Sequence, residues 1–348
     1  MTLIVDGRFL TARPTGLHRV ARGFVAAAKD AGVDLEVWTP GACKSPLADR
    51  ALRVPNGRIG GRLWEQIVLP ATARGRTIWS LTNTAPLLRS GIVVVHDLAA
   101  SVGPQWFAGS MQLYARSVLS SAKRARQVIT VSNAVRAELI DRGVGEDRVT
   151  VVSPAVDERF RPAPAAEVDR IRASLGLRGA YAVMVGWADP RKDVATAVSA
   201  HERTVGEVPH DLVLVGGGHP TFAPVAEPRG ERIKVVGHAS DDDLVALLTG
   251  ATVLLYPSRY EGFGLPPLEA MACGTPAVVS DIPALRESTA GTARLVPPGD
   301  VEGWAEALRD GLRGTVTPSS PPRRTWRSVG DELAAALQGG SVERPRRC

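Results

Sequence analysis

The feature of this sequence that most constrains its fold is a regular alternation of two kinds of segment. Short runs of apolar, often β-branched residues alternate with longer stretches whose apolar residues recur at helical spacing. The short runs are apolar on both faces, which is typical of strands buried in a parallel sheet. This alternation predicts an α/β protein with helices on both faces of its sheets. The runs occur at 3–5, 33–38, 77–81, 92–95, 128–131 and 149–152, and again at 181–185, 212–215, 233–236, 253–256, 277–279 and 294–296.

A proline-rich break divides these runs into two equal sets. Residues 160–164 read Phe-Arg-Pro-Ala-Pro, and two prolines so close together disfavour both helix and strand. The chain of 348 residues is also longer than one ordinary domain of about 100–200 residues. We therefore predict two doubly wound, Rossmann-like domains facing a central cleft, with ligands at the carboxyl ends of the strands. The predicted parts are an N-terminal domain (1–160), a linker (161–165), a C-terminal domain (166–322), a terminal helix (323–338) that packs back on the N-terminal domain, and a flexible tail (339–348).

Composition and cysteine usage bear on the compartment. Apolar residues make up 44% of the chain and charged residues 22%, as in globular proteins. No apolar stretch approaches the roughly 20 residues that span a bilayer, and the first residues lack the features of a signal peptide. The three cysteines, Cys43, Cys273 and Cys348, have spacings that suit neither a disulfide framework nor a zinc site. These observations predict a cytoplasmic protein.

The net charge of +6 is concentrated in the first half of the chain. Residues 1–158 hold 20 lysines and arginines against 13 acidic residues. Such a half either carries ordinary surface charge or faces an anionic partner, and we include peripheral contact with the inner membrane face among its predicted partners. A nucleic-acid partner is not expected, because aromatic residues are not interleaved with the basic ones. The residues considered for membrane contact are Arg53, Arg58, Arg62, Arg74 and Arg76 with Trp64.

The most informative stretch for function is 256–270, which follows a strand and opens a helix. Gly262 and Gly264 allow a sharp turn, and the amides that follow lie at a helix N-terminus, where an anionic diphosphate binds well. Glu269 lies about one turn into the helix, where its carboxylate suits a ribose diol, and Glu261 lies in the loop. Two glutamates eight residues apart would, on their own, favour capping and surface roles, but the Gly-Phe-Gly-Leu-Pro-Pro context favours a binding site.

This stretch, with Glu261 and Glu269 at its centre, resembles the signature of glycosyltransferase family 4, the retaining enzymes of the GT-B fold. The resemblance implies transfer of a hexose from a nucleotide diphospho-sugar to an acceptor hydroxyl. It also implies that no protein nucleophile is used and that a donor phosphate oxygen takes the acceptor's proton. Further segments that resemble the family lie at 14–19, 96–98, 131–133, 186–193, 241–244 and 296–300.

The resemblance assigns further roles. Lys192 would neutralise the leaving diphosphate with help from Arg191, and the amides from Gly262 through Phe263 and Gly264 to Leu265 would bind it. Glu261 would hold the donor sugar. His96 would hydrogen-bond the donor sugar near its anomeric centre, and Gly16 would let the backbone approach the donor. Taken alone, Lys192 also fits a surface turn, His96 a structural position and Gly16 a helix start.

The donor and acceptor are less constrained. Residues 62–70 and 82–86 are similar to bacterial mannosyltransferases, so guanosine diphosphate mannose (GDP-mannose) is the first choice of donor, with uridine and thymidine diphospho-sugars as alternatives. The acceptor is left open among a saccharide, a lipid-linked sugar and a small metabolite. The alternative functions are a catalytically idle nucleotide-sugar-binding subunit and another GT-B enzyme, such as an epimerase or a phosphorylase.

Two other patterns fit structural roles. Residues 241–243 are three aspartates that imitate a metal site, but they follow Ser240 and suit the acidic first turn of a capped helix. Residues 216–218 are three glycines after a strand, yet the spacing of a dinucleotide-binding loop is absent. We therefore predict neither a catalytic metal nor a cofactor.

Overall fold

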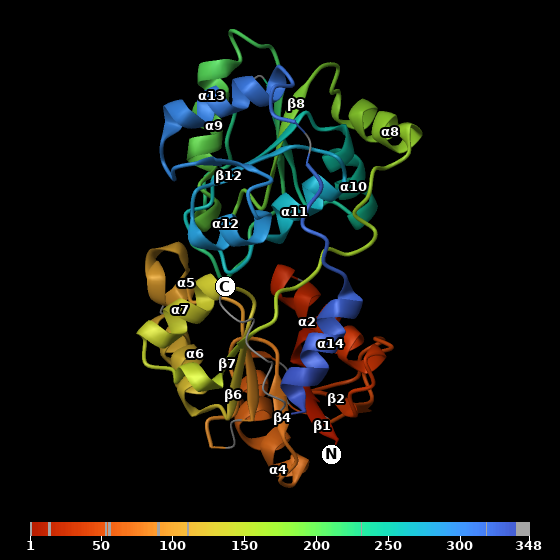
Figure 1. Ribbon diagram of the computed structural model, residues 1–348, viewed down its shortest axis with the longest axis vertical. Coiled ribbons are helices and arrows are strands. Elements are labelled where there is room, and N and C mark those ends of the chain that lie inside the picture. Colours follow the sequence, from red (N-terminus) through yellow and green to blue (C-terminus); the bar gives the residue numbers. More distant parts are fainter. Residues whose placement is uncertain are drawn as a thin grey trace, which may run out of the picture. The chain divides into compact units, whose positions relative to one another are not determined.

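The computed structural model of the chain describes residues 2–12, 15–52, 54, 57–88, 91–109, 111–230, 232–317 and 319–338 (Figure 1). The chain forms two compact units. The first comprises Met1–Leu98, Gln112–Ala155 and Arg324–Cys348, and the second comprises Ala99–Met111 and Val156–Arg323. Each unit is built on one parallel sheet with helices around it, so the predicted α/β class with two doubly wound sheets is confirmed.

The first sheet contains seven parallel strands in the order β3-β2-β1-β4-β5-β6-β7. The chain builds outward from β1 to β3 and then resumes with β4 on the other side of β1. The order of connection therefore reverses between β1 and β4, and ligands of such sheets bind outside the carboxyl ends of the strands at the reversal. The strands are β1 (Leu3–Asp6), β2 (Leu35–Thr39), β3 (Arg50–Ala51), β4 (Ile78–Ser80), β5 (Ile92–Val95), β6 (Gln127–Thr130) and β7 (Val149–Val151).

The helices of the first unit include the last one in the described chain. α14 packs along α2, as Figure 1 shows, with the rings of Trp326 and Phe24 6.2 Å apart. Gly330 permits the approach, because a Cβ at this position would lie 2.5 Å from the carbonyl oxygen of Ala27. The helices are α1 (Arg8–Thr11), α2 (Gly16–Asp30), α3 (Gly57–Leu63), η1 (Trp64–Val68), α4 (Leu69–Ala73), α6 (Gln112–Arg124), α7 (Asn133–Asp141), η3 (Glu146–Arg148) and α14 (Trp326–Leu337).

The second sheet contains six parallel strands in the order β10-β9-β8-β11-β12-β13, so its reversal lies between β8 and β11. Buried apolar clusters cover both faces of this sheet, with Tyr181 and Leu254 in one and Met184 and Trp304 in the other. The strands are β8 (Tyr181–Val185), β9 (Asp211–Val215), β10 (Ile233–Val236), β11 (Val253–Tyr256), β12 (Ala277–Ser280) and β13 (Arg294–Val296). The helices are α5 (Ala99–Val102), η2 (Pro104–Trp106), α8 (Ala165–Leu175), η4 (Pro190–Lys192), α9 (Val194–Thr204), α10 (Asp241–Gly250), α11 (Leu265–Ala272), α12 (Pro283–Thr289) and α13 (Val301–Leu312).

The structure differs from the sequence prediction in residues 99–111. We placed them in the N-terminal domain, but they belong to the second unit. There Phe107 forms an antiparallel bridge with Phe222, flanked by hydrogen bonds from Ala108 N to Thr221 O and from Ala223 N to Trp106 O, both 2.9 Å long. This pairing with a distant loop joins the segment to the second unit.

Some predicted features fall outside the described residues or remain without a test. Pro14, Arg53, Pro318 and the predicted tail 339–348, which includes Cys348, lie outside the described residues, as does the side chain of Arg58. Cys43 and Cys273 are free cysteines. Throughout the described chain, no helix combines the length and apolar character that crossing a membrane requires.

Candidate functional site

The loops after β8 and β11, the two strands at the reversal of the second sheet, bring Lys192 and Glu261 together. Lys192 Nζ donates to Glu261 Oε1 at 2.5 Å and also to the hydroxyl of Tyr256, the last residue of β11. The side chains of Lys192 and Glu261 are only 12% and 9% exposed, so the pair is shielded from solvent. Burial, and then the charge of Glu261, raises the pKa of Tyr256 well above its usual value and keeps the phenol neutral. An ammonium has three N–H donors, so one remains to bind a ligand.

The loop before Lys192 is fixed by Asp189 and Arg191. The Asp189 carboxylate accepts two hydrogen bonds from Arg191 Nε, at 3.1 and 3.0 Å, and one from Nη2 at 2.6 Å. Burial opposes ionisation of Asp189, but the charge and hydrogen bonds of Arg191 outweigh it, so the pKa of Asp189 is lowered on balance. The Arg191 carbonyl accepts from Arg259 N at 2.8 Å, which ties this loop to the one that carries Glu261.

The start of α11 supplies backbone donors beside Glu261. Gly264 caps the helix with φ of 91°, and a Cβ there would lie 2.3 Å from Leu285 Cδ2, so only glycine fits. The first turn of α11 holds no acidic residue, so no side-chain charge offsets the positive end of the helix dipole. Glu269, further along α11, is 5% exposed. Of the residues predicted from the sequence, Gly262, Phe263 and Gly264 thus follow Glu261 in its loop, and Leu265 and Glu269 lie in the helix that this loop opens.

The segment 103–108, which we call the strap, contacts both loops of this site. Arg191 lies over the rings of Phe107 and Phe222, with Cζ 6.0 and 5.2 Å from their centroids. Trp106 packs on Tyr260, the neighbour of Glu261, at a centroid distance of 6.2 Å. Sequence reasoning missed this contact, because its partners lie more than 80 positions apart in the chain.

The first unit holds the other two predicted residues, His96 and Gly16. His96 follows β5 and is 7% exposed; its amide donates to Asn83 Oδ1 at 2.7 Å, and its Nε2 lies 2.8 Å from Leu81 O. Burial lowers the pKa of His96, so the ring is neutral and Nε2 donates to that carbonyl. Its Nδ1 then has no hydrogen-bond partner in the described part of the chain and is free to accept one. Gly16 begins α2, and a Cβ there would meet nothing within 4 Å.

Sequence reasoning missed a buried ion cluster at the reversal of the first sheet. Arg8 lies between two carboxylates, donating from Nε to Asp6 Oδ2 at 2.8 Å and from Nη2 to Glu65 Oε1 at 2.6 Å. Trp64 Nε1 donates to Asp6 Oδ1 at 2.8 Å, and Thr84 Oγ1 donates to Glu65 Oε1 at 2.5 Å. The two stretches that carry the mannosyltransferase resemblance thus contact each other. That shared resemblance was the one available signal for this cluster.

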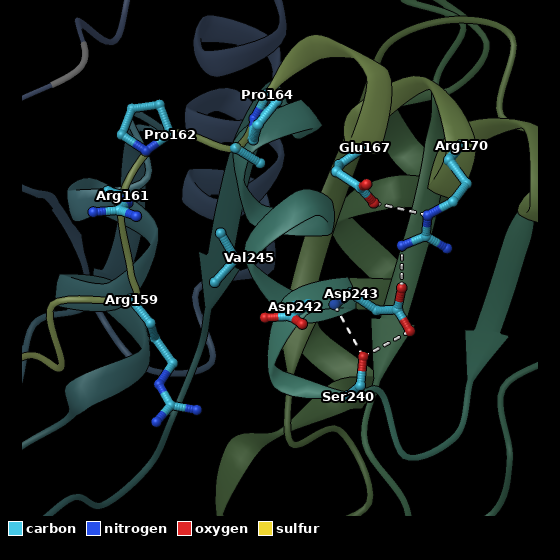
Figure 2. Close-up of a pocket in the computed structure, with 11 residues that line it drawn as sticks. Arg159, Arg161, Pro162, Pro164, Glu167, Arg170, Ser240, Asp242, Asp243 and Val245 are labelled. Atoms are coloured by element: carbon cyan, nitrogen blue, oxygen red, sulfur yellow. Dashed lines mark hydrogen bonds and ion pairs between the residues drawn. The ribbon is translucent and has the colours of Figure 1, made fainter.

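A pocket of about 450 Å³ lies elsewhere in the second unit, beside the segment that leads into α8 (Figure 2). Figure 2 shows Arg170 between Glu167 and Asp243, to which it donates at 2.8 and 2.6 Å. Ser240 Oγ accepts from Asp243 N at 3.1 Å and caps α10, as the sequence predicts. Within the described residues, no group of three His, Cys, Asp or Glu side chains is placed to hold a metal ion. Metal independence stays a prediction.

Comparison with known proteins gives two family matches. Residues 14–160 match the family model described as Glycosyltransferase Family 4, and residues 179–313 match the one described as Glycosyl transferases group 1. The chain is 30% identical over 237 residues to O-antigen chain mannosyltransferase B of Escherichia coli, covering 65% of this chain and 62% of that protein. It is also 30% identical over 275 residues to the D-inositol 3-phosphate glycosyltransferase of Mycobacterium marinum, covering 74% of this chain and 53% of that protein. The matches thus span between half and two thirds of these relatives.

A solved structure shares the whole fold. The crystal structure of Anabaena HepE in complex with UDP-glucose aligns with a TM-score of 0.75 and covers 97% of this chain and 99% of that chain. The sequences are 17% identical, so this likeness concerns the fold alone.

Proposed function

Because the chain belongs to the glycosyltransferases of the GT-B fold, with a family 4 domain followed by a group 1 domain, we propose that it transfers a hexose from a nucleotide diphospho-sugar to an acceptor hydroxyl with retention of configuration. The observation that carries this proposal is the buried Lys192–Glu261 pair beside the start of α11. A buried ammonium beside the amides of a helix N-terminus is suited to stabilise negative charge that develops on a leaving diphosphate.

The residues of the second unit divide the work. The amides from Gly262 to Leu265 and the remaining N–H of Lys192 bind the diphosphate, and Arg191 adds positive charge beside it. Glu269 holds the ribose diol, because a buried carboxylate accepts hydrogen bonds from two neighbouring hydroxyls. Glu261 holds Lys192 in place and accepts from a hydroxyl of the donor sugar. For His96 of the first unit, whose ring is neutral, we propose the hydrogen bond to the donor sugar that the family resemblance implies.

Mannose is the proposed sugar and GDP-mannose the proposed donor. Support comes from the relative named as an O-antigen chain mannosyltransferase. A relative named for D-inositol 3-phosphate and a structural neighbour bound to UDP-glucose favour testing other donors as well.

The test is release of nucleoside diphosphate by the purified protein, with each common nucleotide-sugar in turn and no acceptor. We expect slow release from GDP-mannose and a rise in melting temperature with the same donor. Lys192→Ala should slow the release by about a hundredfold or more. The matched control is Lys29→Ala, which breaks the exposed pair with Asp49 (2.9 Å) and should leave release intact. Neither release nor a thermal shift with any donor would contradict the proposed function.

We also propose that the protein works in the cytoplasm and touches an anionic membrane through its first unit. Trp64, which the sequence analysis placed on this surface, is instead fully buried, because its ring nitrogen donates to Asp6. Ile67 is 58% exposed and Leu88 is 95% exposed, and Arg62 and Arg74 are exposed in the same unit. Apolar and basic residues together favour binding to anionic lipid. Co-sedimentation with phosphatidylglycerol vesicles should occur and should weaken in Leu88→Ser. Equal sedimentation with neutral phosphatidylcholine vesicles would contradict this proposal.

A further inference from the structure

Two hydrogen-bonding atoms of the ion cluster around Arg8 are not used by the contacts within the cluster. Arg8 uses Nε and Nη2 for Asp6 and Glu65, and Nη2 also lies 3.4 Å from the hydroxyls of Thr82 and Thr84. Its Nη1 has no hydrogen-bond partner in the described chain, and neither has Oε2 of Glu65. Neither atom belongs to the fully buried, unpartnered polar atoms of the structure, so both retain access to solvent or a ligand.

Burying these charges is costly for a purely structural role. Asp6 is 1% exposed and Glu65 is 6% exposed, while the Arg8 side chain keeps 20% of its surface. Desolvation of an ion cluster commonly offsets its attraction, and well-packed apolar residues in the same place are often as stable or more stable. Such clusters are therefore more frequent where a ligand is bound. Arg8 Nη1, a donor, and Glu65 Oε2, an acceptor, lie on neighbouring side chains and are suited to bind such a ligand.

The position of the cluster points the same way. Asp6 ends β1, and Thr82 and Thr84 follow β4, so the cluster lies at the reversal of the first sheet. This is the point at which doubly wound sheets bind ligands. The electrostatic influence of Arg8 and Glu65 reaches Tyr114, whose pKa burial raises to about 12. Tyr114 is also joined to the His96 loop, because its hydroxyl accepts from Asn83 Nδ2 at 3.4 Å.

We propose that Arg8 and Glu65, with Thr82 beside them, form the subsite that binds the acceptor, and that the acceptor presents neutral, neighbouring hydroxyls there. A sugar hydroxyl both donates and accepts, so one can donate to Glu65 Oε2 while its neighbour accepts from Arg8 Nη1. Two carboxylates against one guanidinium leave an excess of negative charge, which disfavours a phosphate or carboxylate at this position. This assignment rests on the proposed function, because it presupposes a sugar-transfer reaction that needs an acceptor.

The experiment separates acceptor use from donor use. Purified protein is given GDP-mannose with methyl α-D-mannopyranoside or another neutral methyl glycoside, and transfer is followed together with nucleotide release in the absence of acceptor. In Glu65→Gln we expect the KM for the glycoside to rise by about tenfold to a hundredfold, the loss typical of a hydrogen bond to a charged group. Acceptor-free release should stay within about twofold of the parent. Glu36→Gln, at a carboxylate 41% exposed in the same unit, is the matched control and should change neither quantity.

A second variant covers the case in which Glu65→Gln folds poorly. Arg8→Lys keeps the charge but loses the planar fork, so it should raise the glycoside KM with the same unchanged release. An unchanged glycoside KM in both variants overturns the proposal, as does better transfer to mannose 6-phosphate than to neutral glycosides. A parent protein that releases nucleotide yet accepts neither kind of sugar overturns it as well.

Failure of the proposed function gives a different result from failure of the subsite proposal, because the parent protein then binds and cleaves no donor at all. The subsite is then judged by saturation-transfer NMR of methyl α-D-mannopyranoside, which needs no donor. Loss of the signal in Glu65→Gln but not in Glu36→Gln supports the subsite, and equal signals, or none in the parent, refute it.

Discussion

The two units place a buried ion cluster at the same point of the same kind of sheet, yet the clusters differ in charge. In the first unit Arg8 forms ion pairs with two carboxylates, those of Asp6 and Glu65, so negative charge is in excess. In the second unit Lys192 pairs with Glu261 and Arg191 with Asp189, one to one, and the start of α11 adds unopposed backbone N–H donors.

The difference shows that one architecture can carry two clusters of different charge at corresponding points. The reversal of strand order provides the site in both sheets, because helices diverge there and leave the strand ends open. The residues that follow the strands then set the local charge. A cluster with excess carboxylate suits hydroxyl groups, and a balanced cluster beside a helix N-terminus suits a diphosphate.

The largest effect should come from removing the shared cation of the first cluster. Arg8→Met leaves two carboxylates buried without their partner, which should lower the free energy of unfolding by about 3–5 kcal/mol. Urea denaturation measures this loss. Arg76→Met removes an arginine that pairs with Glu36 at 3.3 Å on the surface, and should cost about 1 kcal/mol or less. Equal losses in the two variants would mean that the first cluster is not a coupled unit.

Removing the cation of the second cluster should affect catalysis more than binding. Lys192→Ala should reduce turnover by about a hundredfold to a thousandfold, the range for a group that stabilises developing charge. The KM for the donor should change much less. Steady-state kinetics with GDP-mannose, the proposed donor, measures turnover and KM separately. A variant with normal turnover and a raised KM would assign Lys192 to ground-state binding instead.

Acid should weaken the two units differently. His201 and His210 of the second unit are buried with Nδ1 and Nε2 2.9 Å apart, and burial lowers the pKa of His201 to about 4. The unfolded chain binds more protons than the folded one between about pH 6.5 and 4, so stability from this histidine is complete above that window and is lost as the pH falls through it. Burial of Asp6 in the first unit raises its pKa, so its contribution has the opposite sign.

Hydrogen exchange, corrected for intrinsic rates, measures this difference. At pH 5 the amides of α9 and β9 should lose more protection than those of β1 relative to pH 7.5. His201→Gln should reduce the difference between the units. Equal loss of protection in both units would exclude the histidine pair as its source.

Glu269→Ala should weaken donor binding by about tenfold to a hundredfold, because it removes a charged hydrogen-bond acceptor. Turnover at saturating donor should fall less, in contrast to Lys192→Ala. Calorimetric titration with GDP-mannose measures the affinity. Glu306→Ala, at an exposed position of α13, is the control. An unchanged affinity would remove Glu269 from the donor site.

The smallest expected effect concerns the strap. Phe107→Ala removes one of the two rings over Arg191 and should weaken donor binding by about twofold to fivefold, the range for an exposed cation–π contact. The control is Val102→Ala, at the end of α5 just before the strap, where the side chain is 42% exposed. If Phe107→Ala retains the parental affinity, the strap does not position Arg191 for the donor.

Local patterns predicted the strands well, because runs such as Ile92–Val95 and Val253–Tyr256 are apolar on both faces and short. The loops after β8 and β11 could also be singled out from the sequence, because the residues of each motif are contiguous in the chain. The Arg8 cluster was not, because Arg8 and Glu65 are 57 positions apart and their contact depends on how the first sheet is ordered. The strap was mispredicted for the same reason, since the Phe107–Phe222 bridge joins distant segments.

The return of the chain to the first unit through α14 has a consequence for biosynthesis. The ribosome makes residues 156–323 of the second unit before α14, so the face of α2 around Phe24 stays uncovered until residues 326–337 have been made. The unit that begins first is therefore completed last. A nascent chain halted before Trp326 would expose this apolar face, and such exposure favours engagement by chaperones.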